Sequence, residues 1–307
     1  MTAFRALLTV FICGYAPWLL AEPYLAIKSG HNCATCHVNP TGGGQRTVFG
    51  DLYAQEQLVA SPSGTGPPWT GTIIEGFRIG GNARTGARQF DFDDRDDNLE
   101  FGIDRVTLYL SAELNEHVTF YLDQQVAPGT SLNREAWVRL RSDDWSLKAG
   151  RIFLPLGWRT EDNTTFVREA TGISMATGDS GFEVGYDTSS FNFQLAATNG
   201  SGGASEVDDG KLFVARAEWS GSRWRVGACA LHNNTDFGDR LVYGAFAGLQ
   251  TGPVSWLVEY DRIEDKDSPF SDLTQDVAFM EANFALAQGH NLKISVEAQG
   301  FDDHRKN

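Results

Sequence analysis

From Thr72 onward the chain alternates apolar and polar side chains along segments of about ten residues. Successive side chains of a β-strand point to opposite faces, so this period of two predicts strands with one apolar and one polar face. The same alternation recurs in residues 117–126, 135–141 and 292–299. In residues 105–114 the apolar face holds Val106, Leu108, Leu110, Ala112 and Leu114, and the polar face holds Arg105, Thr107, Tyr109, Ser111 and Glu113.

The connections between the expected strands are alternately short and long. This is the arrangement of outer-membrane barrels, in which apolar side chains face lipid and polar side chains line the lumen. A soluble antiparallel sheet with one solvated face shows the same alternation, but the region contains no helical pattern to cover an apolar face. We therefore expect an all-β fold, an antiparallel transmembrane β-barrel. The expected strands are residues 72–81, 99–113, 117–126, 134–142, 145–153, 181–187, 190–198, 212–219, 224–233, 240–250, 254–263, 275–287 and 291–300.

These expected strands are odd in number, whereas bacterial single-chain barrels have an even number. A further strand hidden in residues 165–175 would make the number even, but it would break the alternation of short and long connections. We therefore favour a barrel of about 14 strands that is incompletely closed or shortened from a larger one.

Residues 1–21 have the features of a secretory signal peptide. Arg5 supplies the positive charge, an apolar run follows, and the small residue Ala21 precedes Glu22. Pro17 and the length of the run argue against a permanent transmembrane helix. Removal of this segment would change the net charge from −15 to −16, because Arg5 is its one charged side chain.

Three units are expected after the signal peptide. Residues 22–58 are too few to form an independent hydrophobic core and are expected to pack against another part of the molecule. Within them, residues 47–58 predict a short helix. Residues 59–71 form a linker rich in Pro, Gly and Ser, and residues 72–307 form the barrel.

Cys33, Cys36 and His37 form a C-x-x-C-H motif, the signature of covalent c-type haem attachment. Two thiols at this spacing can bond to the two vinyl groups of one porphyrin, and the following imidazole then serves as the proximal iron ligand. A zinc half-site, a redox C-x-x-C pair and a structural disulfide are the alternatives. A zinc site requires a second ligand pair and a thioredoxin-like motif requires a βαβ context. Neither is found, so we expect one covalent haem c.

The sixth ligand of the iron is left open by the sequence. His31 lies two residues before Cys33 and is poorly placed to reach the opposite face of the haem, whereas His117 lies at an expected short turn with the parity of the lumen face. His290, His232, Met175 and Met280 are weaker candidates. A vacant or water-bound sixth position is a further alternative.

The acidic composition excludes a nucleic-acid-binding protein, because nucleic acid requires a basic surface. The expected lumen carries charges of both signs, which favour either a mutually neutralised interior or an anion-selective path. The acidic segment 91–100 could hold a metal ion or could be an ordinary solvated loop. The same alternatives apply to residues 205–209 and 264–267. The expected lumen charges are Arg105, Arg139, Arg141 and Lys148 with Glu113, Asp123, Glu135, Glu259, Glu281 and Glu297.

Residues 24–46, YLAIKSGHNCATCHVNPTGGGQR, followed by a porin-like barrel, resemble the fused outer-membrane monohaem cytochrome–porins. Some members of that family are implicated in oxidising iron(II) at the cell surface. Residues 147–170, LKAGRIFLPLGWRTEDNTTFVREA, resemble a stretch of the phosphate-selective porins. The resemblance implies electron transfer between an outer donor or acceptor and a periplasmic one, with Cys33, Cys36 and His37 as the residues carried over.

The sequence therefore predicts an outer-membrane protein of a Gram-negative cell that carries electrons across the membrane through one haem. The haem segment is expected at the periplasmic side or inside the barrel. The expected partners are outer-membrane lipid, a periplasmic electron carrier such as a cytochrome, and an extracellular donor or acceptor such as iron. The alternative is an anion or solute porin whose haem segment is a gate or redox sensor. A surface iron(II) oxidase is a third hypothesis.

Overall fold

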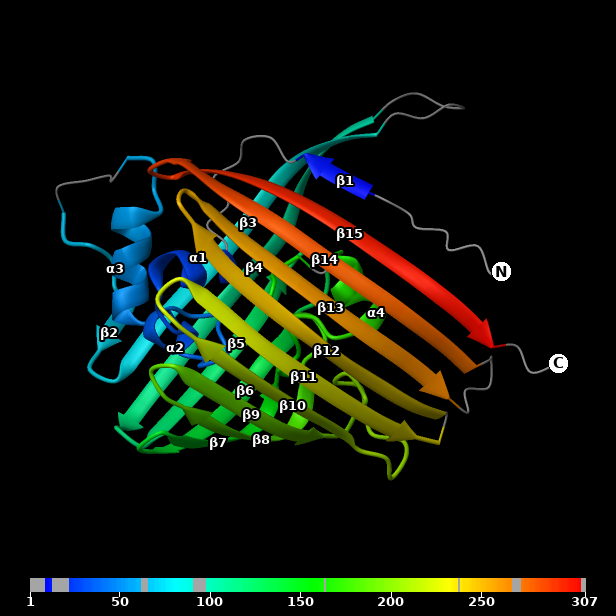
Figure 1. Ribbon diagram of the computed structural model, residues 1–307. Coiled ribbons are helices and arrows are strands. Elements are labelled where there is room, and N and C mark those ends of the chain that lie inside the picture. The colour runs from blue at the N-terminus through cyan, green and yellow to red at the C-terminus, as the bar shows by residue number, and fades with distance from the viewer. Residues whose placement is uncertain are drawn as a thin grey trace.

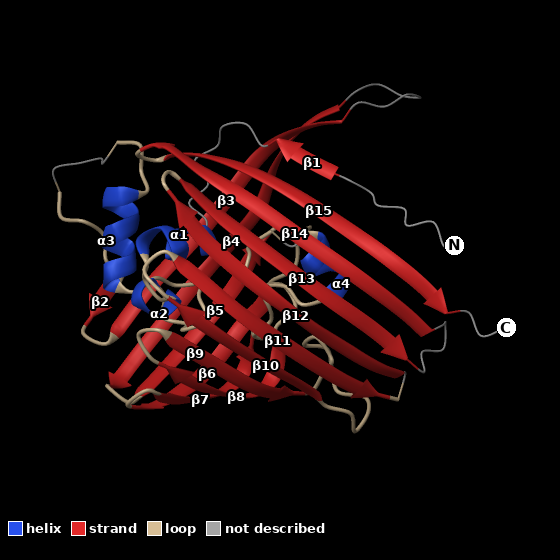
Figure 2. Cartoon of the chain, in the orientation of Figure 1, coloured by secondary structure: helices blue, strands red, loops and turns tan. Residues whose placement is uncertain are grey.

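The computed structural model describes residues 9–12, 22–61, 66–90, 98–162, 164–236, 238–266 and 272–304. They form one antiparallel sheet of 15 strands that curls into a barrel shape, with three N-terminal helices at one rim and a fourth helix packed inside the sheet (Figures 1 and 2). The helices are α1 Pro23–Ser29, α2 Cys33–Cys36, α3 Val48–Gln57 and α4 Phe166–Thr171. The strands are β1 Thr9–Ile12, β2 Thr72–Ile74, β3 Phe77–Phe90, β4 Asn98–Asn115, β5 Val118–Ala127, β6 Leu132–Ser142, β7 Trp145–Ile152, β8 Asp179–Asp187, β9 Phe191–Thr198, β10 Leu212–Ser220, β11 Trp224–Thr235, β12 Gly238–Thr251, β13 Val254–Lys266, β14 Asp272–Ala287 and β15 His290–His304.

The predicted fold class is confirmed, since the long strands β3 to β15 coincide with the expected segments and pair in chain order. The first expected strand is corrected in two respects. β3 continues to Phe90, beyond the expected end at residue 81. The expected strand 72–81 is broken after Ile74, because Gly76 adopts φ 76° and turns β2 back onto β3. At one edge of the sheet, β1 pairs antiparallel with β15. β1 lies within the predicted signal peptide. Among the described residues no pairing joins β1 or β15 to β2 or β3.

The two faces of the strands have the predicted orientation. On β4, Leu108 is 51% exposed and Leu110 is 38% exposed, whereas Thr107 and Ser111 are buried. Apolar side chains therefore cover the outside of the sheet and polar ones point into it, which is the reverse of a soluble protein and is typical of a barrel in lipid. The aromatic side chains of Trp145, Trp219 and Trp224 are also exposed, as expected for residues at a membrane interface.

Residues 153–178, between β7 and β8, depart from the prediction. We expected a long outer loop or a hidden strand, but the chain forms α4 and turns, and α4 packs against β13 and β14 inside the sheet. Pro155 and Gly157 interrupt any strand, and the apolar side chains of Phe153, Leu156 and Trp158 are nearly fully buried. Burial of these side chains explains why the segment, here called the inward loop, folds into the lumen.

The segment 22–61, here called the plug, lies at the rim of the sheet where the strands are joined by short turns (Figure 1). The Asn32 amide donates to the Thr188 carbonyl oxygen at 2.9 Å, in the β8–β9 turn. The Gln288 amide, in the β14–β15 turn, donates to the Glu56 carbonyl oxygen at 2.7 Å. The predicted helix in residues 47–58 is confirmed as α3. In the described part of the chain, no helix is long and apolar enough to cross a membrane.

Candidate functional site

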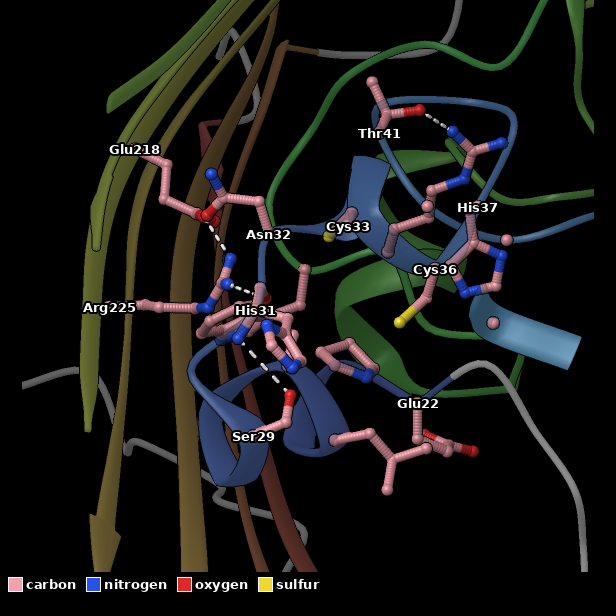
Figure 3. Close-up of a pocket in the computed structure, with 18 of the residues that line it drawn as sticks. Glu22, Ser29, His31, Asn32, Cys33, Cys36, His37, Thr41, Glu218 and Arg225 are labelled. Carbon is pink, nitrogen blue, oxygen red and sulfur yellow. Dashed lines mark hydrogen bonds and ion pairs between the residues drawn. The ribbon is translucent and has the colours of Figure 1, made fainter. Parts of the chain in front are cut away.

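The C-x-x-C-H motif forms one helical turn, α2, that faces a pocket. The His37 backbone N–H donates to the Cys33 carbonyl oxygen at 2.9 Å, which closes the turn. Cys33 and Cys36 are free thiols. Both cysteines and His37 line one pocket with about 980 Å³ of space not filled by protein atoms, a volume that includes open solvent at its mouth (Figure 3). The structure therefore brings the three residues of the motif to the same cavity.

The plug and the inward loop build the walls of this pocket together. Leu25 and Ala26 of α1 and Leu58 after α3 contribute apolar side chains from the plug. The inward loop contributes a second apolar wall. The residues of that wall are Leu154, Pro155, Leu156, Gly157 and Trp158. The charged residues that line the pocket are Glu22, Arg46, Arg159, Arg216, Glu218 and Arg225.

The environment of His37 favours a neutral imidazole. Burial lowers the pKa of His37 to about 4, and the positive charges of Arg46 and Arg159 act in the same direction. The Nδ1 atom is buried and has no hydrogen-bond partner among the described residues. A metal-binding histidine must be deprotonated, and at neutral pH His37 has the required form.

The two thiols are held in protonated form. Burial is the main cause that raises the pKa of Cys33, and burial followed by the proximity of Cys33 raises the pKa of Cys36. Thiols of this kind are poor free nucleophiles at neutral pH, because the reactive species is the thiolate. A catalytic cysteine is therefore not favoured here.

The residues present fit a c-type haem. The two thiols match the two vinyl groups of that cofactor, and the neutral imidazole with an unpartnered nitrogen matches its iron. The apolar walls match the macrocycle, and the arginines match its carboxylates. Haem attachment itself stays a prediction.

Of the two main candidates for the sixth ligand, one lines the pocket and the other does not. His31 lines the pocket, and its ring meets that of Phe49 edge-on at 5.3 Å. His117 lies in the exposed β4–β5 turn, where its Nδ1 atom is 3.0 Å from the Arg141 carbonyl oxygen, and it is not part of the pocket lining. Met175 is buried outside the lining, and His232, Met280 and His290 are exposed. Of these histidines and methionines, only His31 reaches the pocket.

The charges predicted for the lumen hold the plug in place. The Asn39 amide donates to both carboxylate oxygens of Glu135 at 3.0 Å, and the Phe153 backbone N–H donates to the same carboxylate at 3.1 Å. The Lys148 ammonium donates to the Asn39 side-chain oxygen at 3.2 Å and pairs with Glu183 at 2.7 Å. Lys148, one of the predicted lumen cations, is therefore neutralised by Glu183.

Other charged side chains predicted for the lumen also contact the plug or the inward loop. The Arg139 guanidinium donates to the Val38 carbonyl oxygen at 3.0 Å, and Arg105 pairs with Glu161 of the inward loop. Glu259 accepts a hydrogen bond from the Trp158 backbone N–H at 2.9 Å. Arg141 is exposed at a turn. Among the described residues, Arg105 and Lys148 are therefore paired with carboxylates, whereas Arg139 and Arg141 are not.

The candidate metal sites in the acidic segments receive no support. In segment 91–100, residues 91–97 lie outside the described residues. Across the part of the chain that the structure describes, no group of three His, Cys, Asp or Glu side chains is arranged to hold a metal ion.

Sequence reasoning missed the inward loop, Arg46, Arg159, Arg216 and Glu218 as parts of the site. The glycines carried a signal that could have indicated close packing. Gly44 has φ 62°, and a Cβ atom there would overlap the hydroxyl of Tyr121 on the barrel wall. A Cβ atom at Gly50 would overlap the Cys36 carbonyl oxygen. Both glycines are required where the plug packs most tightly.

The inside-out sheet with short turns at one rim defines an outer-membrane barrel of the porin type. The family profile for phosphate-selective porin O and P matches residues 77–240. The chain belongs to this family. The predicted resemblance to phosphate-selective porins is thereby confirmed, as is a porin-type location in the outer membrane.

Solved structures similar to this chain include a porin. An anion-selective porin from Comamonas acidovorans has 11% identity, covers 74% of this chain and 80% of its own, and has a TM-score of 0.52. OccK2 of Pseudomonas aeruginosa has 15% identity, covers 74% of this chain and 65% of its own, and has a TM-score of 0.46. At this identity the likeness shows the fold alone. No curated protein matches the chain.

Proposed function

We propose that this porin-family barrel carries one covalent haem c in its plug and transfers electrons across the outer membrane. The observation that carries the proposal is the convergence of Cys33, Cys36 and His37 on one pocket inside the barrel. The plug and the inward loop fill the lumen around this pocket, which favours passage of electrons over free passage of solutes.

Each residue of the site has a distinct role in this proposal. Cys33 and Cys36 form the two thioether bonds, His37 is the proximal ligand, and His31 is the sixth ligand. When bound, the haem accepts and releases one electron at a potential set by its axial ligands and its burial. The apolar side chains of the inward loop, Leu154 and Trp158 among them, limit the access of water to the pocket.

The short-turn rim is suited to a cationic periplasmic electron carrier. Ala34 and Thr35, between the two cysteines, are exposed at this rim. Acidic residues are exposed in the neighbouring turns, namely Glu116, Asp143 and Asp144. Complementary charge accelerates association with a basic partner. The partner at the other rim is an extracellular donor or acceptor such as iron.

The test is a pyridine haemochrome spectrum of the mature protein, followed by reduction in proteoliposomes. We expect one haem c per chain and reduction of the haem by donors added on either side. A preparation without covalent haem would refute the proposal. A haem that reacts with donors on one side only would refute electron transfer across the membrane.

A second candidate function is an anion or solute porin that the plug closes as a gate or redox sensor. Family membership favours it, because the family is described as phosphate-selective. Conductance in planar bilayers separates the two functions. A large phosphate conductance that changes with the haem oxidation state would support the gated porin. A small conductance in both oxidation states would favour electron transfer.

An iron(II) oxidase remains a narrower form of the first function. Its test is haem reduction in intact cells upon addition of iron(II). Reduction by other outer donors, without reduction by iron(II), would reject it.

A further inference from the structure

Four arginines line the pocket, and they differ in how fully carboxylates of the protein neutralise them. They are Arg46, Arg159, Arg216 and Arg225. Arg216 donates to Glu218 at 2.6 Å and to the Gly157 carbonyl oxygen of the inward loop at 3.1 Å. Arg225 donates to Glu218 at 2.5 Å and to the His31 carbonyl oxygen of the plug. These two arginines and Glu218 clamp the plug to the inward loop. Their charges are committed to that contact.

The charge of Arg159 is only partly neutralised by its contacts within the protein. Its guanidinium lies 3.3 Å from the Glu135 carboxylate, and it also contacts the Thr41 hydroxyl. Its Nε atom is buried without a partner among the described residues. The Glu135 carboxylate is shared with the Asn39 amide and the Phe153 backbone N–H, so it offers Arg159 incomplete compensation.

Arg46 has no ion pair within 4.0 Å among the described residues, although it is half-buried in the pocket lining. The nearby carboxylate of Asp51 is taken by Arg78 at 2.7 Å. Arg46 forms an isolated backbone bridge with His37, which places it next to the proposed iron ligand. A half-buried guanidinium without a counter-ion marks a site for an anionic ligand, because desolvation of an unpaired charge is costly.

The acidic residues of the pocket do not supply that counter-ion. Glu218 serves Arg216 and Arg225, and Glu22 lies 4.0 Å from the Lys293 ammonium. The pocket therefore keeps one free and one partly free guanidinium. A ligand with two carboxylates close to the C-x-x-C-H motif would satisfy both.

We propose that Arg46 and Arg159 bind the two propionate carboxylates of the haem, Arg46 as the main anchor and Arg159 as the second. The inference rests on the proposed haem site and adds the residues that orient the macrocycle in it. An alternative source of the same chemistry is a free solute anion such as phosphate, so the experiment includes both.

The experiment compares the purified haem-loaded wild type with Arg46→Gln, Arg46→Lys and Arg159→Gln. Arg223→Gln is the matched control, because Arg223 is exposed in the β10–β11 turn and does not line the pocket. The readouts are the propionate bending bands in the resonance Raman spectrum and the midpoint potential. Heat-modifiable migration in gels confirms that each variant is folded.

We expect Arg46→Gln to shift the propionate bands and lower the midpoint potential, because a nearby cation favours the reduced haem. Arg159→Gln should shift the bands less, and Arg46→Lys should retain most of the potential while still shifting a band. Propionate bands in Arg46→Gln that match those of Arg223→Gln would overturn the assignment. Arg46-dependent binding of inorganic phosphate to the haem-loaded protein would also overturn it. Absence of haem from the wild type would refute the proposed function as well, so the two failures are distinguishable.

Discussion

At the residue scale, His37 owes its properties to neighbours that are remote in sequence. Arg159, from the inward loop, and burial inside the barrel both contribute to its low pKa. A cysteine in the motif likewise becomes part of a site only because the plug and the inward loop form a pocket around it. The chemistry of the motif is local, but the environment that supports it is supplied by the barrel.

Replacing Cys36 by Ser is expected to abolish one of the two proposed thioether bonds. The mature protein should then contain substantially less haem that survives denaturation. The measurement is haem staining of denaturing gels together with the pyridine haemochrome spectrum. Cys229→Ser is the control, because Cys229 is buried on β11 outside the pocket lining. Equal haem retention in the two variants would contradict the proposed attachment.

Replacing His31 by Leu tests the sixth ligand. Because His31 lines the pocket and His117 does not, His31→Leu should change the visible spectrum and midpoint potential, whereas His117→Leu should leave both unchanged. The axial ligand sets the haem potential over a wide range. An unaltered spectrum in His31→Leu would show that another group or water occupies the position.

At the scale of elements, the plug and the inward loop stabilise one another through Glu135. This carboxylate of β6 accepts hydrogen bonds from Asn39 of the plug and Phe153 of the inward loop, and it pairs with Arg159. One side chain of the barrel wall thus joins two segments that fill the lumen. The plug is thus tied to the barrel wall and to the inward loop by one buried carboxylate.

Replacing Glu135 by Leu is expected to loosen both segments. Removal of one partner from a buried ion pair costs about 3–5 kcal/mol, because the other charge is left unpaired. We expect a lower thermal unfolding temperature of the plug and a larger conductance in planar bilayers. Glu116→Leu serves as the control, because the Glu116 side chain is 85% exposed in the β4–β5 turn. Unchanged conductance in Glu135→Leu, with the loss of stability confirmed, would show that the inward loop alone closes the lumen.

At the scale of the whole molecule, the helices of the plug lie toward the short-turn rim, and Asn39 reaches into the barrel as far as Glu135 of β6. In barrels of this class the short turns face the periplasm. The proposed haem is therefore close to periplasmic carriers, and the remaining length of the barrel separates it from the outer surface. The net charge of −15 makes a cationic carrier the favoured partner.

The rate of haem reduction by a cationic carrier is expected to fall as the ionic strength rises. Neutralising the β6–β7 turn, with Asp143→Asn and Asp144→Asn together, should slow it further, by roughly tenfold at low salt. Asn is compatible with φ 51° at position 143. The control is Asp208→Asn with Asp209→Asn at the opposite rim. Stopped-flow absorbance measures the rates, and equal slowing by both pairs would argue against docking at the short-turn rim.

Much of the fold could be predicted from the sequence, because strand alternation depends on residues only two positions apart. The positions of β4 to β15 and the orientation of their faces follow from that pattern alone. The path of residues 153–178 could not be predicted. Their apolar side chains are compatible with several environments, and only the available space in the lumen selects one of them.

The sequence by itself determined two things: a barrel of alternating strands and a pair of cysteines with a histidine at haem-attachment spacing. Both features depend on residues that are close together along the chain. Only the tertiary structure decided that His31 reaches the pocket while His117 does not, and that Arg46 has no counter-ion among the described residues. The physical reason is that burial and ion pairing depend on side chains brought together from distant segments, and no local pattern records which of them will meet.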